Sequence, residues 1–443
     1  MLELSGHIVM SGAFRLYLRK GGEWMGTTVV FSYPYFGHVN PTVGLVQELV
    51  NRGEQVYYYT TDAYMKYVQM EGVVCRSYGD VLPLLDEEIP IHTTEPLKVL
   101  EQLVPHKLDK HQKMVRLLLE QVMADDPDYI IRDCESYWGK MIGIMMDIPV
   151  ICYITTIALN ETMMDLHCEY FVANVFGNTT GRVALLPEAG SFSEYLNEYT
   201  RQLSIPYAVE FKAIDAFSGA DELNLVFTSR AFQPFAESFG PNYLFLGPMI
   251  REEEKEGGDL PEFEPDLPLI YISMGTVYND CLPFYQKCIE AFQERRWNVI
   301  MSVGQRISPE ELGEFPDHIT IRSHVPQRRL LKHVDVFITH GGHNSTNEAL
   351  YHEVPMLLFP QAADQFAVSS RIEALGAGSI GDSRHCVPSD IASMTEHILH
   401  DPTYAESCKR VGEAIRNEGG VKLGVDVIFA YLIDGALISA ANE

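Results

Sequence analysis

The chain has 443 residues and a formal net charge of −28 at pH 7. Its length exceeds what one ordinary core fills, so we expect two domains of similar size. The acidic balance argues against binding to nucleic acid or to anionic membranes, because both require basic surfaces.

Residues 1–24 have no sustained apolar core before a small-residue cleavage site, so we expect no signal peptide. We interpret them as an N-terminal extension outside the fold. No apolar stretch reaches transmembrane length, and the eight cysteines form no CxxC pair, which favours a reducing compartment. We therefore expect a cytoplasmic protein without stable membrane insertion, either a monomer or a weak dimer.

The first regular pattern is a strand, a turn and a helix. Thr27 to Ser32 predicts the strand and the residues up to His38 the turn, while Asn40 and Pro41 predict the cap and first residue of the helix. A second strand follows at Gln55 to Thr60. This βαβ order places His38 at the carboxyl edge of a sheet, where α/β proteins bind ligands. A lone histidine in a turn is more often a polar surface residue, so its position alone assigns no role.

Tyr129 to Ile131 predicts another strand, with Arg132 and Asp133 at its carboxyl end. A carboxylate there can hold the tautomer of a histidine base and stabilise its protonated form. Asp133 is the candidate partner and Glu135 an open alternative. The competing interpretation of Asp133 is a cap of the helix that follows.

The segment 247–267 is rich in proline, glycine and acidic residues and predicts a linker. It separates an N-terminal domain, 25–246, from a C-terminal domain, 268–420. After the linker, Leu269 to Ser273 predicts a strand that ends in a candidate phosphate loop with Gly275 and Thr276. Ser302 ends the next predicted strand in a similar way. The apolar spacing over 421–443 predicts an amphipathic C-terminal helix.

The most informative stretch begins at the predicted strand Val336 to Thr339, which ends at His340, Gly341 and Gly342. Ser345 with Glu348 three residues later has the pattern of a capping box that opens a helix. The unpaired amides at a helix start bind anions, and glycines let a phosphate approach the backbone. The pattern therefore predicts a phosphate site to which His340 can donate. The next predicted strand, Pro355 to Pro360, leads to Asp364 and Gln365, an acceptor and donor pair suited to sugar hydroxyls.

The segment from His324 to Gln365 resembles the signature box of the UDP-glycosyltransferase family, and the chain from about Met25 resembles its bacterial macrolide glycosyltransferase branch. The resemblance implies a GT-B fold, with two Rossmann-like doubly wound α/β domains facing across a cleft. It implies that the C-terminal helix crosses back to the first domain. It also implies donor-site roles for the following residues: Ser273, Gly275, Thr276, Ser302, His324, Val325, Gln327, His340, Gly342, Asn344, Ser345, Glu348, Asp364 and Gln365.

By this resemblance, the residues from His324 to Gln327 bind the base and ribose, and those from His340 to Ser345 bind the diphosphate. Glu348 binds the ribose, and Asp364 with Gln365 binds the sugar. Many relatives have tryptophan where this chain has His324, and an imidazole offers less stacking area than an indole. The base, UDP or TDP, therefore stays open. Taken alone, Glu348 is equally well explained as a capping residue.

The Gly-His-x-x-Pro element at His38 resembles the N-terminal motif of the family, in which the histidine is the general base and an aspartate at the position of Asp133 pairs with it. A near-neutral imidazole suits removal of a hydroxyl proton at physiological pH. The resemblance also implies acceptor binding near Tyr35, Phe36 and Trp138. His340 and His343 lack a third ligand nearby, so we expect no metal and no bound cofactor.

We therefore expect an inverting, metal-independent transferase that moves a sugar, glucose first, from a UDP-sugar to a hydroxyl of a small hydrophobic acceptor such as a flavonoid, phenol or macrolide. Two alternatives keep the donor motif: a non-catalytic nucleotide-sugar-binding protein and a GT-B sugar-nucleotide epimerase. A dinucleotide oxidoreductase would need a GxGxxG turn after its first strand, which the chain lacks there.

Overall fold

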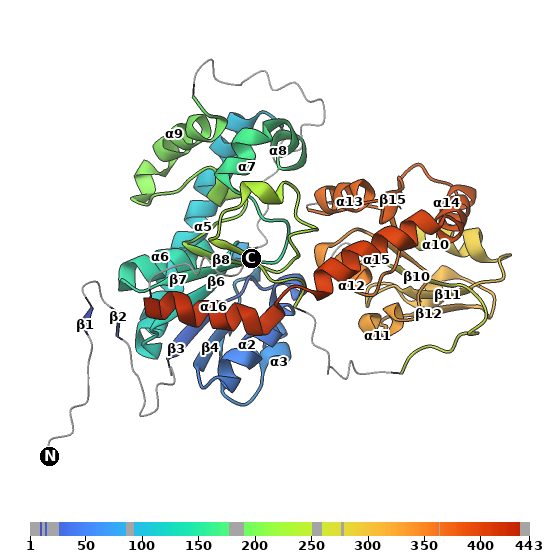
Figure 1. Cartoon of the computed structure of the whole chain (residues 1–443), viewed down its shortest axis with the longest axis horizontal. Helices are drawn as coiled ribbons and strands as arrows, with labels where there is room; N and C mark the ends of the chain where they lie inside the picture. The colour runs from blue at the N-terminus through green and yellow to red at the C-terminus, as the bar shows by residue number, and fades with distance from the viewer. Residues whose placement is uncertain are drawn as a thin grey trace. The chain divides into compact units, whose positions relative to one another are not determined.

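The computed structural model describes residues 9–10, 14–15, 26–85, 93–176, 190–249, 259–275, 279–362 and 364–434. The chain divides into two compact units. Unit 1 comprises Met1–Phe227, Phe235–Met249 and Gly419–Glu443, and unit 2 comprises Thr228–Pro234 and Ile250–Glu418. Each unit is built around its own parallel sheet (Figure 1).

The sheet of unit 1 has seven parallel strands in the order β5-β4-β3-β6-β7-β8-β9. The chain starts in the middle of the sheet, moves to one edge and then returns to build the other half, as in a doubly wound fold. The strands are β3 (Thr27–Phe31), β4 (Gln55–Thr60), β5 (Val73–Ser77), β6 (Tyr129–Asp133), β7 (Val150–Ile154), β8 (Leu223–Val226) and β9 (Tyr243–Phe245).

Helices cover both faces of this sheet, so successive strand residues pack on opposite sides. Val30 packs with α2 (Thr42–Asn51) and α16 (Gly420–Asp434), whereas Val29 and Phe31 pack with α5 (Pro96–Asp125) and α6 (Tyr137–Met146). The remaining described elements of unit 1 are the paired strands β1 (Val9–Met10) and β2 (Phe14–Arg15), the helices α1 (Phe36–Val39), α3 (Asp62–Val68), α4 (Leu82–Leu85), α7 (Glu161–Leu166), α8 (Cys168–Asn174) and α9 (Phe192–Ser204), and the 3-10 turns η1 (Ile205–Tyr207), η2 (Ile214–Ala216) and η3 (Ala236–Ser238).

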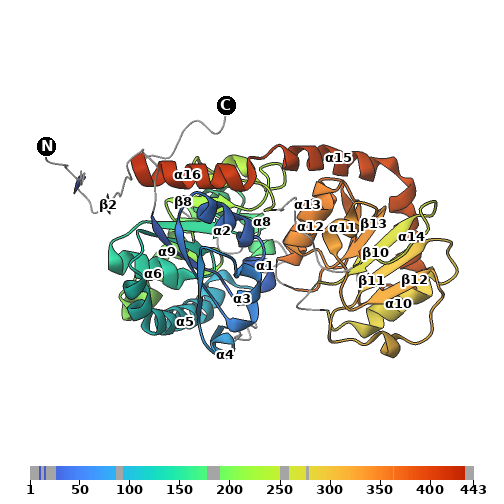
Figure 2. The same cartoon turned by 90° about the horizontal axis from the view of Figure 1, so that it is seen from below.

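The helix α16, the last described element, packs on unit 1 rather than on unit 2, which precedes it in the chain. It lies along α2 (Figure 2). Val425, Ile428 and Leu432 recur at helical spacing and are buried with Leu45 and Val46 of α2. This apolar stripe is the amphipathic pattern of the C-terminal sequence. Residues 435–443 and 1–8 lie outside the described residues.

The sheet of unit 2 has six parallel strands in the order β12-β11-β10-β13-β14-β15. The strands are β10 (Leu269–Ser273), β11 (Asn298–Ser302), β12 (Ile319–Arg322), β13 (Val336–Thr339), β14 (Met356–Leu358) and β15 (Gly378–Ile380). The helices are α10 (Leu282–Phe292), α11 (Gln327–Leu331), α12 (His343–Tyr351), α13 (Gln365–Ala374), α14 (Pro388–His400) and α15 (Pro402–Arg416), with the 3-10 turn η4 (Pro309–Leu312).

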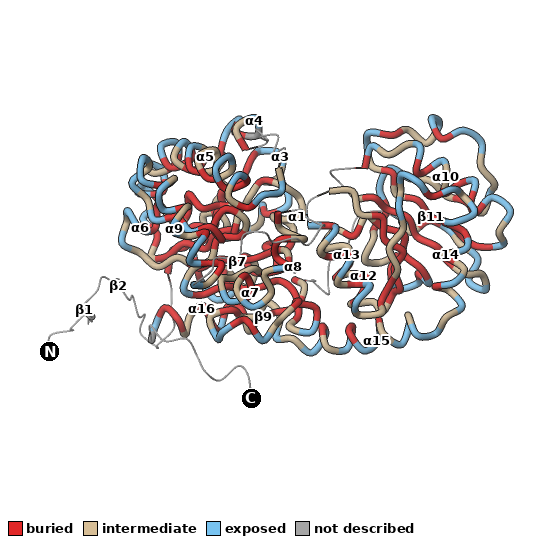
Figure 3. Tube along the Cα trace, turned by 90° about the horizontal axis from the view of Figure 1, so that it is seen from above, coloured by how far each residue is buried: buried red, intermediate tan, exposed pale blue. Residues whose placement is uncertain are grey.

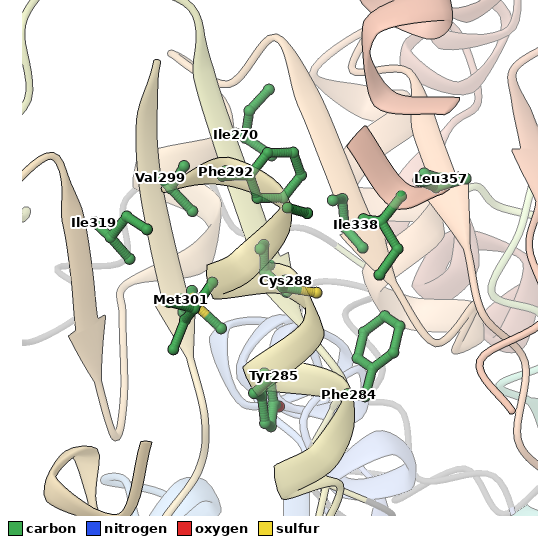
Figure 4. Close-up of a cluster of buried hydrophobic side chains, with 14 of the residues drawn as sticks. Ile270, Phe284, Tyr285, Cys288, Phe292, Val299, Met301, Ile319, Ile338 and Leu357 are labelled. Carbon is green, nitrogen blue, oxygen red and sulfur yellow. The ribbon is translucent and has the colours of Figure 1, made fainter. Parts of the chain in front are cut away.

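The core of unit 2 lies between its sheet and the helices α10 and α14. Phe284, Cys288 and Phe292 of α10 face Ile270 and Ile338 of the two central strands (Figure 4). Their spacing of four residues keeps these side chains on one face of the helix. Truncation of the fully buried Phe292 to alanine is expected to cost about 3–5 kcal/mol. The central strands of both units are buried, the edge strands β5 and β12 are mostly only partly buried, and the longer helices expose one side (Figure 3).

In the described part of the chain no helix is long and apolar enough to cross a membrane.

Two sequence expectations about helix starts are wrong. The residues Phe36 to Val39 form the short helix α1 rather than a turn, and Asn40 is the C-cap of α1 rather than the N-cap of α2, which begins at Thr42 after Pro41. The helix α12 begins at His343, two residues before the expected start at Ser345. The helix α13 begins at Gln365, with Asp364 in the N-cap position. Glycine and proline mark such boundaries only to within a few residues.

Candidate active site

Four of the candidate residues, His38, Asp133, Ser273 and His340, follow or end the strands at the switch points of the two sheets, where the strand order reverses. In unit 1 this point lies between β3 and β6, which run side by side. His38 follows β3 in α1, and Asp133 is the last residue of β6. In unit 2 it lies between β10 and β13, whose last residues, Ser273 and Thr339, are paired in register. Ligands of doubly wound folds bind at such points, because the loops there diverge to opposite faces.

His38 and Asp133 are in direct contact in unit 1. Nδ1 of His38 lies 2.8 Å from Oδ2 of Asp133, whose side chain is 0% exposed. Since a carboxylate only accepts hydrogen bonds, Nδ1 carries the hydrogen and Nε2 is the basic nitrogen. The His38 side chain remains 24% exposed. A buried carboxylate thus orients a partly exposed imidazole, which is the arrangement of a general base.

Glu135, the alternative partner, belongs to a different ion pair. Its Oε2 lies 2.8 Å from Nζ of Lys107 on α5. The backbone N–H of Glu135 donates instead to Oδ1 of Asp133 at 2.9 Å, so the loop after β6 holds the second oxygen of that carboxylate. The structure therefore brings Asp133, and not the side chain of Glu135, to His38.

A residue that the sequence did not reveal also contacts this pair. Oγ1 of Thr155, directly after β7, lies 3.3 Å from Nδ1 of His38. Because β7 neighbours β6 and Thr155 is at its carboxyl end, the rule that found Asp133 would have found Thr155 as well.

The three aromatic residues expected to line the acceptor site have different surroundings. Tyr35 and Phe36 are half-buried next to His38, and the ring centre of Tyr35 lies 6.4 Å from that of His38. Trp138 is 0% exposed and packs in the core with Tyr78 and Met114. The expectation for Trp138 is therefore wrong, because a completely buried side chain offers no surface to an acceptor. Periodicity alone does not separate a site aromatic from a core aromatic.

In unit 2, His340 fits between two glycines. A Cβ atom added at Gly275 would lie 2.5 Å from Nε2 of His340, and one added at Gly342 would clash with the same atom. Only glycine leaves room for the imidazole at both positions. Burial lowers the pKa of His340 to about 4, although a hydrogen bond involving the Ser273 backbone opposes the shift. His340 is therefore neutral at physiological pH and can act as an uncharged donor.

The candidate residues of α12 share one face of the helix. Asn344, Ser345 and Glu348 are partly exposed, whereas His343, Thr346 and Asn347 between them are buried. The buried His343 contacts Nδ2 of Asn347 through its Nε2 (3.1 Å). Among the described residues no group of three histidine, cysteine, aspartate or glutamate side chains is arranged to hold a metal.

The capping-box interpretation of Ser345 and Glu348 is wrong, because Ser345 already lies inside α12. Glu348 is engaged by Gln327 of α11, whose Nε2 donates to Oε2 at 2.7 Å. The hydroxyl of Tyr271 on β10 donates to Oε1 of Gln327 at 3.2 Å and so fixes which way the amide points. The sequence alone does not identify Tyr271 as a site residue. The signal that could have identified it is its polar hydroxyl within an otherwise apolar strand.

The other donor-site candidates have the following positions. Ser273 and Ser302 end β10 and β11. His324 is exposed, but the Val325 side chain is buried, so Val325 can contact a base only through its backbone groups. Asp364 is exposed, whereas Gln365 is buried, and its Oε1 accepts hydrogen bonds from the backbone of Gln361 and Ala362. Thr276 lies outside the described residues.

Comparison with known proteins agrees with this geometry. Residues 289–419 match the family model of the erythromycin biosynthesis protein CIII-like C-terminal domain. A Bacillus subtilis (strain 168) protein named uncharacterized UDP-glucosyltransferase YojK is 30% identical over 406 residues, which are 91% of this chain and 97% of that protein. NDP-glycosyltransferase YjiC of the same strain is 31% identical over 413 residues, 92% of this chain and 98% of its own.

The crystal structure of CalG4, the calicheamicin glycosyltransferase, superposes with a TM-score of 0.76 at 26% identity and covers 93% of this chain and 99% of its own. The expected GT-B fold is thereby confirmed, and the chain is a glycosyltransferase. More particularly, the chain belongs to the UDP-glycosyltransferase family, in its macrolide glycosyltransferase-like branch.

Proposed function

We propose that this protein transfers a sugar, glucose in the first instance, from a UDP-sugar to a hydroxyl of a small hydrophobic acceptor such as a flavonoid, phenol or macrolide, with inversion and without a metal. The observation that carries the proposal is the contact of 2.8 Å between Nδ1 of His38 and Asp133. A donor-binding protein without catalysis would have no use for a buried carboxylate that orients an exposed imidazole.

In the proposed reaction, Nε2 of His38 accepts the proton of the acceptor hydroxyl. The acceptor oxygen attacks the anomeric carbon opposite the diphosphate, the bond from that carbon to the phosphate oxygen breaks, and UDP leaves. Asp133 stabilises the imidazolium that forms. A single displacement of this kind inverts the anomeric configuration. Nearby aromatic rings, Tyr35 and Phe36, suit an apolar or aromatic acceptor.

For the donor, we propose that His340, Gly342, Asn344 and Ser345 bind the diphosphate at the start of α12. The helix dipole and backbone N–H groups favour an anion there even though the chain as a whole carries −28 charges. The neutral imidazole of His340 donates one hydrogen bond. Since these groups meet the charge of the leaving diphosphate, the reaction needs no metal.

We assign the ribose to Glu348, which Gln327 orients, and the sugar hydroxyls to Asp364, with Gln365 holding the loop before α13. The base contacts fall to His324 and the Val325 backbone. The names of the relatives support UDP-glucose through the UDP-glucosyltransferase and leave other nucleotides open through the NDP-glycosyltransferase. TDP-glucose is therefore the second donor to test.

The test is transfer from UDP-glucose and TDP-glucose to a panel of phenolic and macrolide acceptors, followed by mass spectrometry with EDTA present. The parent and the His38→Ala variant are compared, and UDP binding is measured for both. A glycoside formed by the parent alone, with equal UDP binding, supports the proposal. Equal product from both proteins, or a complete loss of product in EDTA that added Mg²⁺ restores, would contradict the assigned base or the metal independence respectively.

A further inference from the structure

Arg132 is a buried charged residue in the strand β6, after the apolar residues Tyr129 to Ile131. It is the fourth residue of β6, directly precedes Asp133 and is 0% exposed. Strands covered by helices on both faces are normally apolar throughout. The burial of a guanidinium at this place therefore calls for a specific reason.

The guanidinium of Arg132 reaches forward along its own chain. Nη1 donates to the backbone carbonyl oxygens of Asp133 at 3.1 Å and of Cys134 at 3.3 Å. Nε donates to Oδ2 of Asp221 at 2.7 Å. One side chain thus ties the end of β6 to the loop that precedes β8.

Asp221 is itself held in place. Its backbone N–H donates to Oδ1 of Asn224 at 2.9 Å, and Nζ of Lys140 lies 3.4 Å from its Oδ1. The backbone N–H of Gly219 in the same loop donates to the carbonyl oxygen of Cys134 at 3.2 Å. The partner of Arg132 therefore belongs to a loop that other hydrogen bonds already hold in place, so Arg132 is anchored by it.

The segment that Arg132 holds is the one that orients the Asp133 carboxylate. One carboxylate oxygen contacts His38 and the other accepts from the backbone N–H of Glu135, so the plane of the group depends on the backbone from 133 to 135. A rotation of this backbone would move the oxygen that faces His38.

Stability alone does not explain the arrangement. A buried ion pair often contributes no more than an apolar side chain of the same volume, since both charges lose their hydration. Within the described part of the chain Nη2 of Arg132 has no hydrogen-bond partner, and an unsatisfied buried donor costs about 1–3 kcal/mol. Costly groups of this kind concentrate where a function requires a defined geometry.

We propose that Arg132, anchored by Asp221, is a positioning residue for sugar transfer: it fixes the end of β6 so that Asp133 meets Nδ1 of His38. This inference rests on the roles assigned to His38 and Asp133 under the proposed function. Arg132 acts through Asp133 and contacts neither substrate.

Arg132→Lys is the decisive variant. It keeps a positive charge opposite Asp221 but replaces the planar fork by one terminal nitrogen, which cannot hold Asp221 and both carbonyl oxygens in this geometry. We expect kcat to fall about 10- to 100-fold, as for a small misplacement of a catalytic group, while KM for UDP-glucose stays within about twofold. The acidic limb of the pH profile of kcat/KM should move to lower pH, because His38 then loses part of the support of Asp133.

Arg76→Lys is the matched control. Arg76 forms an arginine–aspartate pair with Asp125 (2.5 Å) in the same unit. Asp125 is the last residue of α5 and precedes β6, so this pair does not hold the loop 133–135. Thermal unfolding is measured for both variants, so that the loss of stability caused by the same arginine-to-lysine substitution is compared between the two sites. Asp221→Asn, which removes the charge that anchors the guanidinium, replaces Arg132→Lys if that variant does not fold.

Three results decide the matter. A lower kcat and a displaced acidic limb in Arg132→Lys but not in Arg76→Lys would establish the positioning role. Wild-type kcat and pH profile, or equal losses in both variants that follow their unfolding temperatures, would overturn it. If His38→Ala transfers sugar as the parent does, the proposed base is wrong, and that result is separate from the outcome for Arg132.

Discussion

Nδ1 of His38 and Oδ2 of Asp133 are 95 positions apart in the chain and 2.8 Å apart in unit 1. The contact arises because β3 and β6 are neighbours in the parallel sheet. His38 follows β3 and Asp133 ends β6, so both lie at the carboxyl edge of the sheet. The parallel sheet thereby brings together an imidazole and a carboxylate that can stabilise its protonated form.

Asp133→Asn should lower kcat about 10²- to 10⁴-fold without a comparable change in donor affinity, because an amide cannot hold the tautomer or stabilise the imidazolium. Steady-state kinetics and UDP titration measure the two effects. Glu135→Gln is the matched control: it removes a carboxylate two residues away that pairs with Lys107, and it should keep most activity. A larger loss in the control than in Asp133→Asn would show that the wrong acid was assigned.

Tyr271→Phe should raise KM for the donor about 3- to 10-fold, since a hydrogen bond of this kind contributes about 1 kcal/mol. The hydroxyl orients Gln327, which in turn orients Glu348, so its loss frees the proposed ribose ligand without removing it. We expect kcat to change little. Tyr58→Phe removes a buried hydroxyl bonded to Thr42 in unit 1 and serves as the control. Equal KM values in the two variants would contradict the role of Tyr271.

Gly342→Ala should both weaken UDP binding, by about tenfold or more, and lower the unfolding temperature, because its methyl group would occupy the place of the His340 ring. The backbone at Gly342 (φ −66°, ψ 138°) is one that alanine adopts, so the clash is the cause. Adding His340→Ala should restore the unfolding temperature but not UDP binding. Recovery of binding in the double variant would mean that His340 is no diphosphate ligand.

Stability should fall as the pH is lowered from about 6.5 towards 4. Burial lowers the pKa of His340 and of His352 to about 4 and that of His111 well below its ordinary value; nearby lysines add to the shift at His352 and His111. In the unfolded chain these histidines titrate near pH 6.5. Over this interval the unfolded state binds more protons than the native state, so each histidine removes up to about 1.4 kcal/mol of stability per pH unit.

The check is the unfolding temperature of the parent and of His352→Gln between pH 7.5 and 4.5. His352 lies at the end of α12 outside the proposed site, and its replacement removes one of the titrating groups. The variant should therefore lose less stability on acidification than the parent. Parallel curves for the two proteins would show that His352 is not held neutral by the fold.

Much of the architecture follows from local sequence. The apolar strands Tyr129 to Ile131 and Val336 to Thr339 were found because both faces of a parallel sheet are buried, and their polar ends followed from the end of that pattern. Helix starts were placed less well at Asn40 and Ser345. There the side chains could cap a helix, but the neighbouring backbone had already entered one.

By itself the sequence determined that His38 and His340 each follow a strand at the edge of a parallel sheet, because strand periodicity and glycine turns depend only on neighbours in the chain. The tertiary structure decided that Asp133 rather than Glu135 meets His38, that Trp138 belongs to the core, and that Arg132 ties β6 to Asp221. These outcomes depend on how far side chains reach between segments distant in sequence, and no local pattern encodes that distance.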